Sequence, residues 1–390
     1  MSPFLTDDYA EVEATYFAEL RRRGEVDADP SGWRGNWVEA GQWAPLPQLR
    51  ASDLVPYYID EGEALARYKE LIATLLRTWD GYDIRQDEFT LCPSGASTSL
   101  VTLATLKHLG VGRIIFETPS YFASIDQATQ LGLACDLVPT YRRDAYALPP
   151  LEPWIREGSH VAVWLTQPRA SLGFNQPAEL IAHLLEQLPS TSYVVVDEAT
   201  EQTLPLHLGQ LAAEHRAANL IRLRSFTKGM GLNGLRLASI LHPARLRAPF
   251  VHCLEFIGAS VDAHSLNAVG MLAVDINRFR TMLEAANNQV NALRGRAERL
   301  VAGSWLSVNH LTNGYIGTMV ADLTALGDDQ AERRTKFLEG CRRVHTPVML
   351  GASSYVAVDV PTEAIRLNFF RPPDDLLRGI TNILSIWPAF

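Results

Sequence analysis

The sequence predicts an α/β protein in which helices cover a mainly parallel sheet. Through the middle of the chain, short apolar runs of strand length alternate with helical segments of roughly 10–15 residues, the pattern of βαβ units. The chain has 390 residues, of which 47% are apolar and 20% charged. That is enough for one large and one smaller packed domain.

The order of the predicted elements divides the chain. A short amphipathic helix is expected in the first 25 residues, and a Trp-rich irregular arm follows over 26–56. The next expected elements are helix 62–79, helix 97–109, strand 111–116, helix 123–131, strand 134–139, strand 160–165, helix 178–188, strand 193–196, strand 220–224 and strand 237–241.

The remaining chain predicts a long helix and a second, smaller α/β unit. Residues 265–301 form one helical pattern, and short strands mixed with helices follow it. We therefore expect an N-terminal arm over 1–50 that joins the small domain. A large domain is expected over 51–275, and an interdomain helix with the small domain over 276–390.

Composition excludes several classes of protein. The net charge is −9, from 35 basic and 44 acidic residues, which disfavours nucleic acid or an anionic membrane as the main partner. No apolar run reaches the roughly 18 residues of a membrane span, and the acidic N-terminus does not resemble a secretory signal. The four cysteines form no CxxC pair and the histidines show no ligand spacing, so we expect a cytoplasmic protein without a metal site.

The most informative segment runs from Arg224 through Ser225 and Lys228 to Arg236, with a Gly-rich bend after the lysine. A nucleophilic lysine needs a lowered pKa, which burial and neighbouring cations supply. A lone Lys-Gly pair is more often a surface lysine beside a loop. The surrounding segments decide between these interpretations.

Ser225-x-x-Lys228 with Arg236 resembles the Schiff-base segment of fold-type I enzymes that use pyridoxal 5′-phosphate (PLP), specifically the class I/II aminotransferase-like group. Further segments agree with this resemblance in the same order along roughly residues 50 to 390. They are Tyr57, Ser94-Gly95-Ala96-Ser97, Thr118-Pro119-Ser120-Tyr121, Val194-Val195-Val196-Asp197-Glu198-Ala199 and Ala364-Ile365-Arg366-Leu367-Asn368-Phe369.

The resemblance implies a fold and a cofactor. The expected fold is a large domain with a seven-stranded, mainly parallel sheet, plus a small α/β domain built from both chain ends. The expected cofactor is PLP, held by Lys228 as a Schiff base, with Asp197 meeting the pyridine nitrogen and Tyr121 stacking on the ring. Taken alone, Asp197 would pass for a cap or turn residue and Tyr121 for a core aromatic.

The phosphate and the substrate have their own expected residues. The resemblance assigns the phosphate to the helix start at Ser94–Ser97 and to Ser225 and Arg236. Tyr57 would reach the phosphate of a neighbouring subunit in a homodimer with shared sites. Arg366 would bind the α-carboxylate of an amino acid substrate. The alternatives are an ordinary N-cap at Ser94, a surface ion pair at Arg236 and a charged strand residue at Arg366.

Two positions depart from the family pattern. Where the family carries an asparagine that contacts the PLP phenolic oxygen, this chain has Ala170, which donates no side-chain hydrogen bond. Where the family carries a tyrosine with the same target, this chain has Thr200, whose hydroxyl is shorter. We assign cofactor contact to Thr200 and none to Ala170.

These departures leave two enzyme hypotheses open. The first is a PLP-dependent aminotransferase acting on an α-amino acid. The second is a PLP-dependent elimination, replacement, cyclisation or related reaction on a specialised amino acid. A ligand-sensing regulator is disfavoured, because only about 50 residues precede the first family-like segment and they lack a basic helix–turn–helix pattern.

Overall fold

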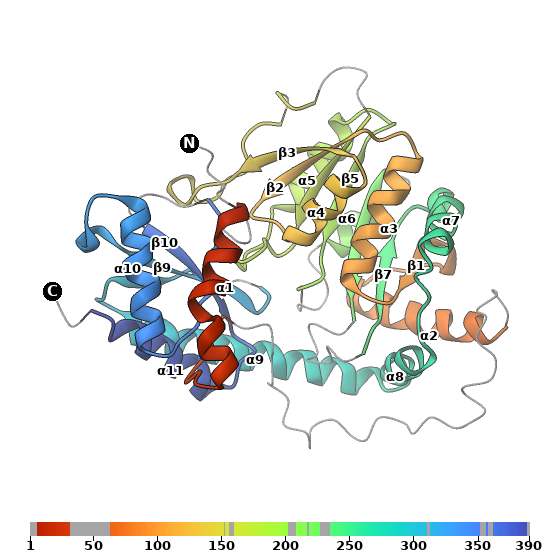
Figure 1. Cartoon of the computed structure of the whole chain (residues 1–390). Coiled ribbons are helices and arrows are strands. Elements are labelled where there is room, and N and C mark those ends of the chain that lie inside the picture. Colours follow the sequence, from red (N-terminus) through yellow and green to blue (C-terminus); the bar gives the residue numbers. More distant parts are fainter. Residues whose placement is uncertain are drawn as a thin grey trace.

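The structure is a computed structural model that describes residues 6–31, 63–151, 153–155, 160–201, 208–216, 218–226, 235–309, 313–351, 356–357 and 362–387. These ranges contain two sheets, each with helices packed against it (Figure 1). The larger sheet has seven strands and the smaller has three.

The large sheet is mainly parallel, as the sequence predicts. Its strands lie in the order β1-β7-β6-β5-β4-β2-β3, and the five from β6 to β3 are mutually parallel. Strand β7 runs antiparallel to both of its neighbours. The strands are β1 (Phe89–Cys92), β2 (Arg113–Thr118), β3 (Ala134–Pro139), β4 (Val161–Thr166), β5 (Tyr193–Asp197), β6 (Leu220–Ser225) and β7 (Ala238–Leu241).

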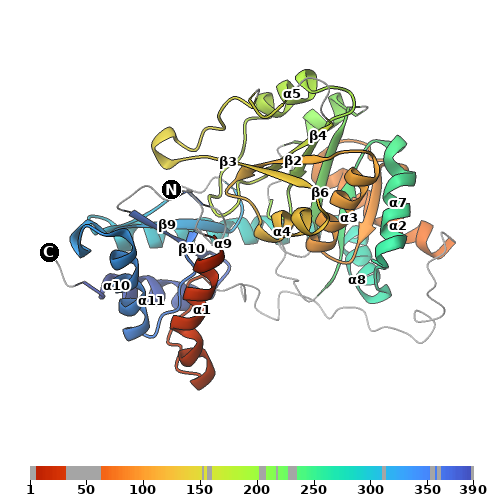
Figure 2. The same ribbon diagram turned by 45° about the horizontal axis from the view of Figure 1, so that its top comes forward.

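Helices cover both faces of this sheet, which buries apolar side chains on each face. One face packs against α3 (Gly95–His108), α4 (Phe122–Gln130) and α7 (Arg247–Ile257). The other face packs against α5 (Ala178–Gln187) and α6 (Gly209–Glu214). Figure 2 shows α5 and α4 on opposite sides of the strands.

A third core lies beside β1 and β7. It is formed with α2 (Glu63–Asp80) and α8 (Ala263–Val274), which pack against each other. Trp79 of α2 makes an edge contact with Phe279 of α9 (Ile276–Val301), with ring centroids 5.4 Å apart. This core therefore joins the large sheet to the start of the long helix.

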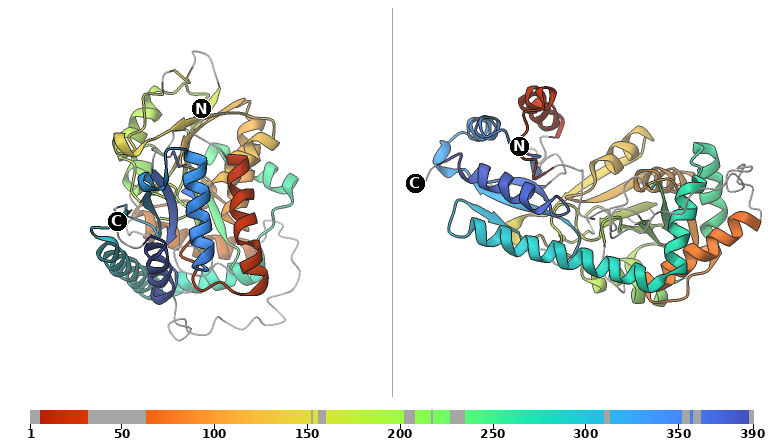
Figure 3. Two further views of the ribbon diagram at one scale, coloured as in Figure 1. Left: turned by 60° about the vertical axis from the view of Figure 1, so that its left-hand side comes forward. Right: turned by 90° about the horizontal axis from the view of Figure 1, so that it is seen from below.

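The small unit contains segments from both ends of the chain. Its antiparallel sheet has β9 (Ile316–Asp322) between β8 (Leu306–Val308) and β10 (Thr362–Asn368). The helices α1 (Thr6–Arg23), α10 (Gln330–Arg343) and α11 (Pro373–Leu384) pack with it. Figure 3 shows α9 running from the helices of the large sheet to this unit.

The predicted single helix over 265–301 is wrong in one respect. The structure has two helices there, α8 and α9, separated at Asp275. The Asp275 carboxylate accepts a hydrogen bond from the Arg278 backbone N–H at 3.1 Å, so it caps α9. Because the backbone of Asp275 leaves the helical region, with φ −115° and ψ 73°, the periodic pattern hides a break.

Candidate active site

A pocket lies at the carboxyl-terminal ends of β4 and β5. Tyr121, Asp197 and Thr200 line it, and Ile316 of the small sheet also contributes to its wall. Open α/β sheets bind ligands outside the carboxyl ends of their strands. This pocket, which we call the candidate pocket, is therefore the candidate active site. Its other lining residues are Ser120, Thr166, Pro168, Arg169, Ala170, Ser171 and Ala199.

Asp197 is the last residue of β5, as the sequence predicts. It is paired with Thr166 on β4 and Leu223 on β6, so parallel strands hold its backbone on both sides. One carboxylate oxygen accepts a hydrogen bond from the Ala199 backbone N–H at 3.0 Å. The half-buried carboxylate is thus fixed at the edge of the sheet.

Tyr121 precedes α4, and its ring centroid lies 5.0 Å from that of Phe122. Burial raises the pKa of the Tyr121 phenol, and the negative charge of Asp197 raises it further. The positive charges of Arg236 and Arg366 act in the opposite direction. Four residues predicted separately from the sequence are therefore close enough to interact at one site.

Residues Ser94 to Ser97 form the start of α3. The Ser94 hydroxyl oxygen accepts a hydrogen bond from the Ser97 backbone N–H at 3.0 Å and lies 2.8 Å from the Ser97 hydroxyl. Ser94 is thus the N-cap, which was the ordinary alternative for this residue. Gly95, Ala96 and Ser97 are half-buried in the first turn, where backbone N–H groups lack intrahelical acceptors.

Ser225 ends strand β6, and Arg236 lies just before the neighbouring strand β7. Ser225 is the buried last residue of β6 and is paired with Ala238 of β7. Arg236 lies two residues before β7, with its side chain exposed. Its backbone N–H donates a hydrogen bond to the Ser265 hydroxyl at 2.9 Å. The exposed Arg236 does not line the candidate pocket, but its charge acts on the Tyr121 phenol there.

Arg366 lies on β10 and only 1% of its surface is exposed. Its Nε and Nη2 donate hydrogen bonds to the backbone carbonyl of Ser31, at 3.2 and 2.6 Å. In return, the Ser31 hydroxyl donates to the Arg366 carbonyl at 2.6 Å. The chain just after α1 thus fixes the orientation of the Arg366 guanidinium.

The two departures from the family pattern lie together in the wall of the candidate pocket. Ala170 presents a methyl group there, and its backbone N–H donates to the Thr166 hydroxyl at 3.0 Å. Thr200 is half-buried in the same wall. Lys228 and Tyr57 lie outside the residues that the structure describes.

The sequence profile of the family described as "Aminotransferase class I and II" matches residues 61–363. The chain belongs to this family. One curated relative is a histidinol-phosphate aminotransferase from Oleidesulfovibrio alaskensis, with 36% identity over 103 residues. That match covers 22% of this chain and 25% of the relative, so it spans about a quarter of the relative's length.

Solved structures of other family members share the fold. A double mutant of Thermus thermophilus aspartate aminotransferase superposes with a TM-score of 0.74 at 16% identity, covering 97% of this chain and 96% of that one. An aromatic aminotransferase from Pyrococcus horikoshii has a TM-score of 0.69 at 14% identity, covering 96% and 91%. The predicted large and small α/β units with a seven-stranded sheet are therefore confirmed.

Several residues at the site were not assigned a role from the sequence. Ser120 lies in the segment Thr118–Tyr121, and Arg169 and Ser171 flank Ala170, so their neighbours in the chain were a usable signal. Ile316 and Ser31 had no such signal, because only the three-dimensional fold brings the small unit and the chain after α1 to the site. Among the described residues, no three His, Cys, Asp or Glu side chains are grouped as metal ligands. In the same part of the chain, no helix combines the length and apolarity needed to cross a membrane.

Proposed function

We propose that this protein is a PLP-dependent aminotransferase that acts on an α-amino acid. The observation that carries the proposal is that Tyr121 and Asp197 line one pocket at the carboxyl-terminal ends of β4 and β5, with the charges of Arg236 and Arg366 near enough to act on the Tyr121 phenol. A carboxylate, an aromatic ring and two arginines are the groups that a pyridinium ring, a phosphate and a substrate carboxylate require. Family membership supports the same activity.

The described residues fit PLP. The first turn of α3 offers backbone N–H groups and a helix dipole to a phosphate, and Arg236 adds a positive charge. Ser225 is a further phosphate contact in this proposal. The Ser120 hydroxyl lines the candidate pocket and has no hydrogen-bond partner within the described residues, so it can bind a polar group of a ligand. When bound, PLP supplies an electron sink for negative charge that develops at the substrate Cα.

Each protein group has a proposed task. Asp197 keeps a proton on the pyridine nitrogen, because a nearby carboxylate favours the positive charge. Tyr121 would hold the ring by stacking, and Arg366, which the Ser31 carbonyl orients, would attract the α-carboxylate by its positive charge. Lys228 would hold the cofactor and would move a proton at the substrate Cα.

The protein is further proposed to be a cytoplasmic homodimer. Tyr57 would reach the phosphate in the partner's site, and light scattering should give twice the mass of one chain. Cys92, Cys135, Cys253 and Cys341 are all free thiols, which supports a reducing compartment.

A second candidate function follows from the wall at Ala170. A methyl group in the family asparagine's place donates no hydrogen bond to the cofactor or the substrate carboxylate. At the position of the family tyrosine, Thr200 supplies a shorter hydroxyl group. This change favours a specialised PLP reaction, such as β- or γ-elimination, replacement or cyclisation.

The two candidates differ in the fate of the cofactor. The purified enzyme is incubated with single amino acids in the absence of a keto acid, and the cofactor is then released with acid and identified by chromatography. Conversion to pyridoxamine 5′-phosphate in an amount equal to the enzyme supports transamination. Unchanged PLP with consumption of the amino acid supports the second candidate. A protein that binds no PLP contradicts both.

A further inference from the structure

The ends of β5 and β6 carry different chemistry on the two faces of the sheet. Side chains alternate between faces along a strand. Val195 and Leu223 lie in the core under α3, so Asp197 and Ser225, two residues further along, belong to that same face. Glu198 and Arg224 belong to the opposite face.

The opposite face buries four charged side chains. We call Asp80, Glu198, Arg222 and Arg224 the buried charge cluster; each is at most 3% exposed. Arg222 donates to both Asp80 oxygens, at 2.7 and 3.1 Å, and to both Glu198 oxygens, at 2.7 and 3.0 Å. Arg224 Nη2 lies 3.0 Å from Glu198 and 3.6 Å from Asp80.

Opposite charges face each other within the cluster. Burial by itself raises the pKa of Glu198, but the charges of Arg222 and Arg224 outweigh burial and hold that pKa below its usual range. A further buried carboxyl, that of Glu201, hydrogen-bonds Glu198. Removing one charge of the cluster changes its net charge by one unit in a region of low dielectric, where the field of a charge extends far.

Stability does not account for this arrangement. A buried ion pair is often no more stable than apolar side chains of similar volume. Arg224 is costly in particular, because none of its nitrogens makes a hydrogen bond within the described residues, although its guanidinium lies 5.1 Å from the Trp79 ring centroid. A charge kept at this cost invites a functional explanation.

One peptide bond joins the cluster to Asp197 in the candidate pocket, and another joins it to Ser225, the proposed phosphate contact. Glu198 follows Asp197 directly, and its backbone N–H donates to the Leu223 carbonyl at 2.9 Å. Arg224 precedes Ser225 directly. A shift of either cluster side chain therefore moves the backbone that carries Asp197 or Ser225.

We propose that Glu198 and Arg224 are positioning residues, which orient Asp197 and Ser225 from the opposite face of the sheet and balance the electrostatic potential at the candidate pocket. The inference rests on the proposed function. We therefore expect the net charge of the cluster to change the pKa of the bound cofactor. A negative cluster favours protonated, cationic forms of the cofactor, and a positive cluster disfavours them.

Two substitutions test the sign. Glu198→Gln makes the net charge of the cluster more positive by one unit, and Arg224→Met makes it more negative by one unit. The protein loaded with PLP is titrated while its visible absorbance is followed. We expect the midpoint to fall for Glu198→Gln and to rise for Arg224→Met, each by about one pH unit for charges on the order of 10 Å apart at an effective dielectric constant of about 20.

The same variants have readouts that do not depend on the loaded enzyme. Both should weaken PLP binding to the protein without cofactor, measured by equilibrium dialysis, and both should lower the thermal unfolding midpoint. Arg224→Lys keeps the charge and should return the titration midpoint to that of the unmodified protein. If Arg224→Met does not fold, Glu198→Gln and Arg224→Lys still decide the proposal.

Neighbouring charges are the same in all these proteins. The charged groups that act on the phenol in the candidate pocket are Asp197, Arg236 and Arg366. Those facing the cluster are Tyr82, whose pKa burial raises to about 12, and Glu201, which hydrogen-bonds Glu198. None of these groups is replaced, so opposite shifts of the titration midpoint would be caused by the changed charge of the cluster.

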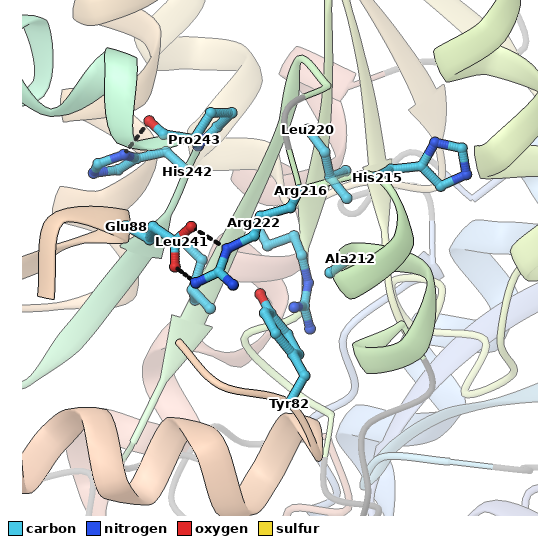
Figure 4. Close-up of a pocket in the computed structure, with 10 residues that line it drawn as sticks. All are labelled: Tyr82, Glu88, Ala212, His215, Arg216, Leu220, Arg222, Leu241, His242 and Pro243. Carbon is cyan, nitrogen blue, oxygen red and sulfur yellow. Dashed lines mark hydrogen bonds and ion pairs between the residues drawn. The ribbon is translucent and has the colours of Figure 1, made fainter. Parts of the chain in front are cut away.

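A control pair lies at the other end of the same strands. Figure 4 shows Glu88 and Arg216 paired in a pocket that Arg222 and Tyr82 also line. Glu88→Gln and Arg216→Met change charge by the same amounts, but near the amino end of β6 rather than beside Asp197. We expect them to lower stability without moving the titration midpoint or the affinity for PLP.

The outcomes separate this inference from the proposed function. Equal midpoints in the unmodified protein, Glu198→Gln and Arg224→Met would overturn the inference, as would shifts in the same direction. Lowered stability with unchanged affinity for PLP would assign the cluster a structural role alone. An unmodified protein that shows no visible band with PLP would instead contradict the proposed function.

Discussion

Arg366 on β10 donates two hydrogen bonds to the carbonyl of Ser31, a residue 335 positions earlier in the chain. A second hydrogen bond supports the same attachment: the Asn368 backbone N–H donates to the Pro30 carbonyl at 3.0 Å. The chain after α1 is therefore fixed to the strand that carries the proposed substrate arginine. Binding of the substrate carboxylate at Arg366 is therefore expected to depend on the position of this segment.

Replacement of Arg366 by lysine should weaken substrate binding. Lysine keeps the charge but loses the planar fork that makes two parallel hydrogen bonds to a carboxylate. A hydrogen bond to a charged group contributes about 1.5–3 kcal/mol, so kcat/KM should fall roughly 10- to 100-fold, mainly through KM. Steady-state kinetics with the preferred amino acid checks this prediction.

Arg334→Lys is the matched control for Arg366→Lys. Arg334 lies on α10 and pairs with Glu363 of β10 at 2.9 Å, and unlike Arg366 it does not act on the Tyr121 phenol of the candidate pocket. The control should keep KM unchanged. An equal rise of KM in both variants would show that Arg366→Lys acts by destabilising the small unit and not by weakening the contact with the substrate carboxylate.

Gly379→Ala should displace the segment that holds Arg366. A Cβ at this position in α11 would lie 2.8–3.0 Å from three atoms of the Pro30 ring. Overpacking of this kind costs about 1–3 kcal/mol. We expect a lower free energy of unfolding and a higher KM, measured by denaturant titration and kinetics. An unchanged KM despite lost stability would contradict the proposed link between Pro30 and Arg366.

Asp197→Asn should remove most of the activity with little loss of stability. Asparagine can still accept the Ala199 hydrogen bond, but its neutral amide does not stabilise a protonated pyridine nitrogen. Loss of such an electrostatic contact typically lowers kcat about 100-fold or more. Asp136→Asn serves as the control. Asp136 lies on β3 and pairs with Arg113 of β2, and its replacement should leave kcat unchanged. Full activity of Asp197→Asn would exclude the assigned role.

Stability should depend on His242 below neutral pH. Burial lowers the pKa of His242 to about 4 from its usual 6.5, although the hydrogen bond to the Pro243 carbonyl acts in the opposite direction. The Pro243 carbonyl can only accept, so Nδ1 carries the proton of the neutral ring and Nε2 accepts from the Thr90 hydroxyl at 3.0 Å.

The sign of this dependence follows from proton uptake. Between pH 6.5 and pH 4 the unfolded chain binds a proton at His242 that the folded protein does not, so the free energy of unfolding falls as the pH falls through this window. At pH 4.5 the loss from this group is on the order of 2 kcal/mol relative to pH 7. Urea unfolding at both pH values should show a smaller loss for His242→Gln. Parallel losses would contradict the assignment.

Much of the large sheet could be predicted because its strands are short apolar runs between helices. The prediction missed β1 (Phe89–Cys92), although it found β7, which has the same length. It also could not give the direction of β7, because side chains alternate between the two faces in parallel and antiparallel strands alike. The break at Asp275 was hidden for a similar reason: the apolar periodicity continues across it, and only the cap geometry reveals it.

The candidate site was predictable where the chain keeps family segments, as at Asp197 and Tyr121. The buried charge cluster was not, since Asp80 and Arg222 are 142 residues apart and their pairing depends on the packing of α2 against the sheet. One signal was present: Arg222 and Arg224 alternate with apolar residues along a buried strand, which places two charges on one face.

The central claim is that Lys228 carries the cofactor, and one measurement tests it most directly. The purified protein is loaded with PLP, reduced with borohydride, digested and analysed by mass spectrometry, with Lys228→Ala as control. We expect one phosphopyridoxyl group per chain on the peptide that contains Lys228, and none in the variant. A label on another lysine, or no label in the unmodified protein, would contradict it.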